Sequence, residues 1–235
     1  MNDDLDTVTR EVALPPSLPP SPSPSPVVAV RGPSTTDDVL DLDEARRTRI
    51  FGGFVLGLIV VVVAGLPLVG GDPLARWIHV GGLVAAAVTA LWFRAVAREP
   101  AAYRAWHNVV LGHACVVAIT TGFYYWGPFS AALLIIPFGA FIFSASRNLG
   151  GALSVTIHLV VAYSVIGLAL LTGVLPDRTL ISSAHLPRST QLVLLVAIVA
   201  IFLATFVVAR QLRASSRAAI EQLDRALRAL GQREA

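Results

Sequence analysis

The sequence predicts an all-α membrane protein with six transmembrane helices, a disordered N-terminal tail and a C-terminal amphipathic helix. Its composition is the first observation: 55% of residues are hydrophobic, only 14% are charged, and the mean hydropathy is positive. This balance is typical of integral membrane proteins and not of soluble domains. The second observation is a series of six apolar segments between residues 50 and 209, each close to the roughly 20 residues that cross a bilayer. The third is that the charged residues lie outside these segments or at their ends.

Residues 1–45 are expected to form a disordered, Pro/Ser-rich cytoplasmic tail. The stretch from Pro15 to Pro26 is dominated by proline and serine, which favours polyproline II and cannot bury a core. A docking site for a proline-recognising module, or a phosphorylated Ser-Pro tract, is the alternative. An acidic stretch, Asp37 to Glu44, precedes three arginines and predicts a juxtamembrane helix that ends at the bilayer surface. Acidic residues at the very start replace the positive region of a signal peptide, so we expect insertion through the first helix.

The six transmembrane helices are expected at about residues 50–69, 74–96, 108–126, 129–146, 149–171 and 190–209, which makes 46–209 the membrane bundle and 210–235 a separate signalling helix. Pro137, followed by Gly139, predicts a kink in the fourth helix. Glycine pairs at 52–53, 81–82 and 150–151 predict close packing between helices. The connection at 172–189 is too short for a separate domain.

The distribution of arginine predicts the orientation, because short cytoplasmic loops carry an excess of basic residues. All eighteen basic residues are arginine. With the N-terminus inside, the outer side receives only Arg76, Arg178 and Arg188. The inner side receives Arg46, Arg47, Arg49, Arg94, Arg98, Arg104, Arg147, Arg210, Arg213 and Arg217. We therefore expect a multi-pass protein of the inner (cytoplasmic) membrane with both termini in the cytoplasm and the lipid bilayer as its main partner. The same placement explains the basic charge without nucleic-acid binding.

Polar groups inside a bilayer are costly, so they mark candidate sites for a ligand or stimulus. His113 and His158 lie on different predicted helices and could hold a haem, a metal or a polar head group. They could equally be neutral imidazoles that hydrogen-bond a neighbouring helix. The full set of ligand or stimulus candidates is His79, His113, His158, Thr120, Tyr124 and Tyr125. The single cysteine, Cys115, lies in an apolar run and excludes disulfides within the chain.

The sequence contains no motif that would make the chain itself an enzyme. It has no Walker lysine, no G-x-S-x-G, no H-E-x-x-H and no Cys/His zinc spacing. We therefore predict no catalytic residue, no metal site and no cofactor, with haem between His113 and His158 as the minor alternative. No acidic residue lies inside the six apolar segments, so a transporter that uses a carboxylate relay lacks its carrier.

The C-terminal segment is predicted to be a helix that can pair. Ile220, Leu223, Leu227 and Leu230 alternate spacings of three and four, which places them on one stripe. Glu221 precedes Arg225 by four residues, and Asp224 precedes Arg228 by four, so one-turn ion pairs are expected. About two heptads are present, fewer than a long coiled coil has. We expect a homodimer through this stripe; the alternative is a helix that lies on the inner leaflet.

This plan resembles the membrane sensor or anchor regions of bacterial multidomain signalling proteins. Class III adenylate cyclases, six-helix sensor histidine kinases and membrane Ser/Thr kinases share it. The run from Asp43-Glu44-Ala45-Arg46-Arg47 to Ile220-Glu221-Gln222-Leu223 looks most like the last group. The resemblance implies a sensor or transducer that relays a stimulus through the sixth helix to a cytoplasmic effector, a Ser/Thr kinase or cyclase domain or protein.

None of the kinase's glycine-rich loop, lysine or H-R-D residues is present, so no catalytic residue is carried over from the resemblance. The chain is then expected to be a sensor whose output lies in a truncated continuation or on another protein. A small transporter or channel with a path lined by Thr120, His113 and His158 is one alternative reading. A membrane redox protein with haem between the two histidines is the other.

Overall fold

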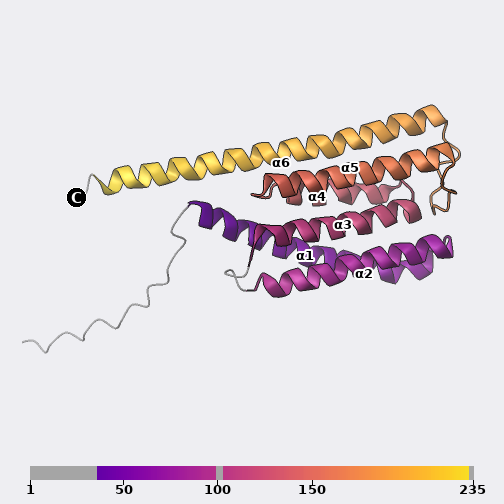
Figure 1. Cartoon of the computed structure of the whole chain (residues 1–235), viewed down its shortest axis with the longest axis horizontal. Coiled ribbons are helices and arrows are strands. Elements are labelled where there is room, and N and C mark those ends of the chain that lie inside the picture. Colours follow the sequence, from indigo (N-terminus) through magenta and orange to yellow (C-terminus); the bar gives the residue numbers. More distant parts are fainter. Residues whose placement is uncertain (1–35, 99–102, 233–235) are drawn as a thin grey trace, which may run out of the picture. The chain divides into compact units, whose positions relative to one another are not determined.

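The computed structural model describes residues 36–98 and 103–232, and every regular element in that part of the chain is helical. The first 35 residues, where most of the expected disordered tail falls, lie outside it. Figure 1 shows the helices in order along the chain. They are α1 (Thr36–Val69), α2 (Pro73–Val96), α3 (Ala105–Trp126), the short 3₁₀ helix η1 (Ala131–Ile135), α4 (Ile136–Ser144), α5 (Leu149–Thr172) and α6 (Arg188–Gly231).

Five of these helices, α1, α2, α3, α5 and α6, are long and apolar enough to cross a membrane, which makes this a multi-pass membrane protein. The fourth expected helix is different, because its segment divides into η1 and the nine-residue α4. Pro137 explains the break: it lacks a backbone N–H and is tolerated in the first turn of a helix, which is where it lies in α4. In place of the kink expected at Pro137, the chain changes from a 3₁₀ helix to an α-helix just before this residue.

The first and last helices are longer than the sequence predicts. α1 begins at Thr36, so the juxtamembrane helix expected from Asp37 to Glu44 is continuous with the first apolar segment and does not belong to a disordered tail. α6 runs for 44 residues without a break. At 1.5 Å per residue its length is about 66 Å, against about 30 Å for a hydrocarbon core. The expected sixth span and the C-terminal helix are therefore one rod.

The ends of the other helices follow from local chemistry. Gly70 and Gly71, with φ of +80° and +90°, end α1 in the left-handed region that glycine tolerates. Asp72 then caps α2: its Oδ1 accepts a hydrogen bond from the Ala75 amide at 3.0 Å, and Pro73 occupies the first helical position. Asn148 caps α5 in the same way, by accepting from Gly151 N at 3.0 Å.

The helices pack through small residues and aromatic rings, with α3 between α2 and α5. A Cβ added at Gly82 of α2 would collide with Thr121 and lie 3.1 Å from the Ala118 backbone of α3. Gly151 of α5 faces Val109 of α3 in the same way. The close packing expected at the glycine pairs is present at these two positions, whereas Gly81 faces open space.

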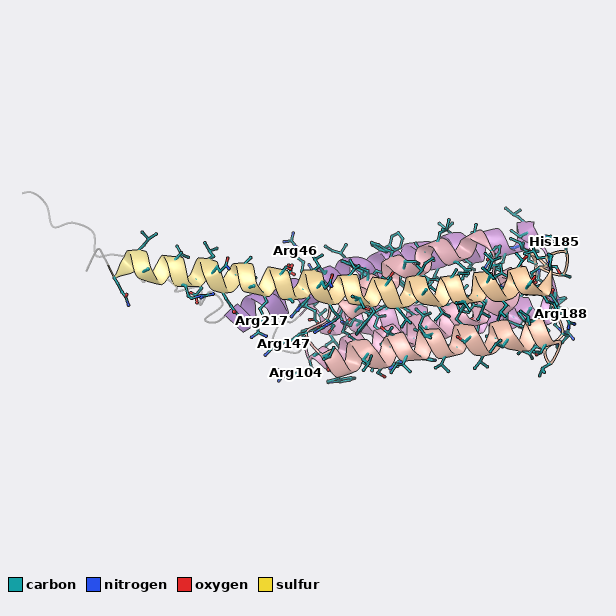
Figure 2. All side chains as sticks on the ribbon, turned by 90° about the horizontal axis from the view of Figure 1, so that it is seen from above. Arg46, Arg104, Arg147, His185, Arg188 and Arg217 are labelled. Atoms are coloured by element: carbon teal, nitrogen blue, oxygen red, sulfur yellow. The ribbon has the colours of Figure 1, made fainter. Side chains whose placement is uncertain are left out.

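The bundle has two chemically different ends. Figure 2 shows Arg46, Arg104, Arg147 and Arg217 toward one end and His185 and Arg188 at the other. We call the first the arginine-rich end. The second, which carries the connection between α5 and α6, is the loop end.

Gly82 and its neighbour Gly81 give a matched test of this packing. We expect Gly82→Val to force α2 away from α3 and to lower the free energy of unfolding by about 1–3 kcal/mol, the usual cost of overpacking. Gly81→Val adds the same side chain into open space and should cost much less. Thermal unfolding in detergent compares the two variants, and equal losses would contradict the contact at Gly82.

Candidate functional site

Two of the sequence-predicted site residues, His79 and Tyr125, meet near the loop end. His79 of α2 is only 4% exposed, and its ring stacks on Tyr125 of α3 with centroids 5.6 Å apart. Its Nε2 accepts the Trp126 indole N–H at 3.2 Å, so the proton of a neutral imidazole is on Nδ1. Nδ1 lies 3.4 Å from the Thr121 hydroxyl, which in turn donates to Ala118 O at 2.8 Å. Each polar group of His79 therefore has a partner while the ring is neutral.

Tyr125 also ties the surrounding loops together. Its hydroxyl donates to Gly70 O at 2.6 Å, and its own carbonyl accepts from Leu180 N at 2.7 Å. The connection between α5 and α6 is held further by an ion pair of 2.8 Å between Arg178 and Asp72. The Ala75 backbone N–H, and then Arg178, hold the pKa of the Asp72 carboxyl below its usual value. The loop end is thus fixed to α1, α2 and α3 by hydrogen bonds.

The other two histidines form a separate pair between α3 and α5. The Nδ1 atoms of His113 and His158 are 2.9 Å apart, and His113 Nε2 lies 3.1 Å from Ser154 Oγ. Both rings are half-buried, at the surface of the bundle. Two nitrogens that bind one metal from opposite sides lie about 4 Å apart, given metal–nitrogen distances near 2.0 Å. The pair therefore does not fit a bis-histidine haem; its geometry is that of a hydrogen bond between two helices.

The remaining candidates do not join either group as a binding site. The Thr120 hydroxyl donates to Val116 O of its own helix at 2.7 Å, so it is occupied in the way typical of threonine in membrane helices. Tyr124 packs beside the buried residues Leu66 and Ala75. Within the part of the chain that the structure describes, no three His, Cys, Asp or Glu side chains lie close enough to hold a metal.

Among the residues that the structure describes, the Glu44 carboxylate has the most polar partners, although it is not among the candidates that the sequence predicts. It lies on α1 near the arginine-rich end and is 3% exposed. Its Oε1 accepts hydrogen bonds from Ser146 Oγ at 2.7 Å, Tyr103 OH at 3.1 Å and Asn108 Nδ2 at 3.4 Å. Its Oε2 accepts from Arg147 N at 2.6 Å. One carboxylate therefore connects α1, α3 and the turn between α4 and α5.

Two arginines of α6 complete this cluster. Arg213 pairs with Glu44 Oε2 at 3.5 Å and donates to Ala145 O at 3.2 Å. Arg210 donates to Ser146 O at 2.6 Å. These carbonyls end or follow α4, where unpaired C=O groups carry partial negative charge. We name the cluster of Glu44, Ser146, Arg147, Arg210 and Arg213 the Glu44 latch.

The latch holds the point at which α6 leaves the bundle. The side chains of Arg213 and Glu44 are 10% and 4% exposed, so water screens their pair little. Removing one partner of a buried charge pair costs about 3–5 kcal/mol, because the other charge is left uncompensated. Beyond the latch residues 214–219 are exposed, as are Leu223, Leu227 and Leu230. The latch is thus where α6 changes from a packed to an exposed helix.

One sequence feature could have identified Glu44. It precedes Thr48 by four residues and Phe51 by seven, and these three side chains are buried on one face of α1. By composition alone, Glu44 belongs to an acidic stretch that precedes the first apolar segment. The ion pair expected between Glu221 and Arg225 differs: Glu221 pairs with Arg217 at 2.9 Å, and Arg225 Nε donates to Glu221 O.

A double-mutant cycle tests the neutral network at His79. His79→Phe leaves the half-buried Trp126 N–H without its acceptor, and we expect a loss of about 1 kcal/mol in the free energy of unfolding. Trp126→Phe removes the donor, so the double variant should cost less than the sum of the two single variants. Thermal unfolding in detergent measures all four proteins. Strictly additive losses would show that the two side chains do not interact.

No family model matches the chain, and the comparisons with curated proteins and with solved structures find no match.

Proposed function

We propose that this protein is a membrane transducer, in which a stimulus at the bundle is relayed through α6 to an effector at the arginine-rich end. One observation carries the proposal. α6 is a single uninterrupted helix that packs in the bundle, passes the Glu44 latch and continues as an exposed helix with an apolar stripe. Such a helix transmits a displacement along its length.

We infer an orientation with the arginine-rich end in the cytoplasm. Arg46, Arg104, Arg147 and Arg217 are on that side, whereas Arg188 is at the loop end (Figure 2). Basic residues in short connections favour the cytoplasmic side of a membrane. An effector that binds the exposed part of α6 is then cytoplasmic. The resemblance noted above favours an effector of the Ser/Thr kinase type.

The latch supports a switch between discrete positions. A shift of α6 along or about its axis changes the distance between Arg213 and Glu44, both of which are buried. If α6 moved only part of the way, the charges of Arg213 and Glu44 would be separated without new partners, which is costly in a buried site. Positions of α6 between two fully paired states are therefore disfavoured. The route from the loop end is also continuous: Gln191 at the start of α6 donates to Ser183 O and Leu186 O at 2.9 and 3.0 Å. A displacement of that loop therefore reaches α6 directly.

The latch is tested by a spin label on the exposed part of α6. We expect Glu44→Gln and Arg213→Gln to change the mobility and the inter-label distances of a label at Ala226→Cys, in a Cys115→Ala background in nanodiscs. Arg217→Gln removes the same charge one turn further along, outside the latch, and is the matched control. If both latch variants give the spectra of the unmodified protein, the latch does not set the position of α6.

The stripe is tested by charge insertion. Leu223 and Leu227 are 61% and 59% exposed, which is costly for a helix in water unless it pairs. We expect Leu223→Asp with Leu227→Asp to convert a dimer into a monomer, as measured by light scattering in detergent. Ala218→Asp with Ala229→Asp adds the same charge away from the stripe and should leave the dimer intact. A monomeric unmodified protein would instead favour the helix lying on the membrane surface.

A further inference from the structure

We propose that a cavity between α1 and α6, beside the Glu44 latch, binds the phosphate of an acidic phospholipid head group. The cavity has a volume of about 70 Å³. One water molecule needs about 10–15 Å³ by the same kind of measure, so the cavity has room for a phosphate group. Its lining includes Asp43, Arg47, Ala209, Leu212, Arg213 and Ser216.

Arg47 supplies the first reason for an anionic ligand. Its Nε is 3.0 Å from Asp43 Oδ2 but is directed so that it makes no hydrogen bond, although the atom is buried. A buried N–H without an acceptor is costly, and native structures rarely leave one. The planar guanidinium group matches phosphate oxygens, which it can bind through two parallel N–H groups.

The opposite wall of the cavity is cationic as well. Arg213 brings a second guanidinium from α6, and Ser216, one turn further along, brings a hydroxyl. Asp43 is the only acidic side chain in the described lining, and Arg213 also pairs with Glu44 of the adjoining latch. With Arg210 of the latch included, three arginines face the two carboxylates of Asp43 and Glu44. A phosphate between Arg47 and Arg213 would balance the one positive charge in excess and would bridge α1 and α6.

The apolar part of the surroundings points to a lipid as the source of the phosphate. Ala209 and Leu212 line the cavity on the side toward the membrane segment of α6, and Leu212 is 55% exposed. Val208 of α6 and Ile50 of α1 are 56% and 64% exposed at the same level of the bundle. Acyl chains can therefore lie along these residues while the head group reaches the arginines. The exposed Arg46 and Arg49 nearby further favour acidic over zwitterionic lipids.

The experiment measures lipid retention by the full chain with native mass spectrometry. The probes are phosphatidylglycerol and, as the zwitterionic reference, phosphatidylcholine with the same acyl chains. We expect the unmodified protein to retain phosphatidylglycerol selectively. Arg47→Gln should bind phosphatidylglycerol about tenfold more weakly, because a charge-assisted hydrogen bond is lost. Arg49→Gln lies on the same helix, removes the same charge and does not line the cavity. It should bind as the unmodified protein does.

Further measurements distinguish a phospholipid site from a site for free phosphate. Arg47→Lys keeps the positive charge but loses the planar guanidinium group, so we expect an affinity for phosphatidylglycerol between those of the unmodified protein and Arg47→Gln. If Arg47→Gln unfolds, Arg47→Lys is used in its place. Inorganic phosphate at millimolar concentration should displace the lipid poorly; displacement at an affinity equal to that of the lipid would show a site for free phosphate. Equal weakening by Arg47→Gln and Arg49→Gln, or equal retention of the two lipids, would overturn the proposal. The site stands whether or not α6 relays a signal.

Discussion

A carboxylate can be buried at the end of a membrane bundle only if its neighbours supply the hydrogen bonds that water would otherwise give. Glu44 meets this condition with donors from Ser146, Tyr103, Asn108 and the Arg147 backbone, and with the charge of Arg213. These partners come from three separate parts of the chain besides α1, which carries Glu44. The positions of α1, α3, the turn after α4 and α6 therefore depend on one side chain, since none can move without leaving a buried polar group unpaired.

The loop end is held by a different kind of chemistry. There a neutral imidazole, an indole N–H and tyrosine and threonine hydroxyls are paired, and the ion pair between Asp72 and Arg178 lies at the surface. Neutral networks respond weakly to salt, whereas charges near the surface of the arginine-rich end respond to nearby ions and lipids. The two ends of one bundle thus differ in what can disturb them. This difference makes the arginine-rich end the one whose contacts depend more on the surrounding charges.

The sequence predicts the parts of this structure that depend on local pattern. The spans at 74–96 and 149–171 agree with α2 and α5 to within one residue at each end, because Asp72-Pro73, Asn148 and Gly173 mark their limits chemically. Hydropathy predicts one helix at 129–146, where the structure has η1 and α4, because hydropathy does not distinguish a 3₁₀ turn from an α-helix. The spacing of Glu44 to Thr48 and Phe51 indicates a buried face, but its pairing with Arg213 could not be predicted, because Arg213 is 169 positions away and only the packed bundle brings the two together. His79 and Tyr125 are both candidates from the sequence, but the sequence does not predict that their rings stack on each other.

Because α6 is continuous, the Glu44 latch also determines how the exposed part of the helix is oriented. A helix that is broken at the membrane surface would lose any rotation at the break, but α6 is hydrogen-bonded from Arg188 to Gly231. The latch residue Arg213 and the stripe residue Ile220 are seven positions apart, or about 10 Å along one rod. Two turns of a helix are stiff on that scale, so the direction in which Leu223 and Leu227 point is set by how Arg210 and Arg213 are held. A change at Glu44 is therefore coupled by geometry alone to the direction in which the stripe points.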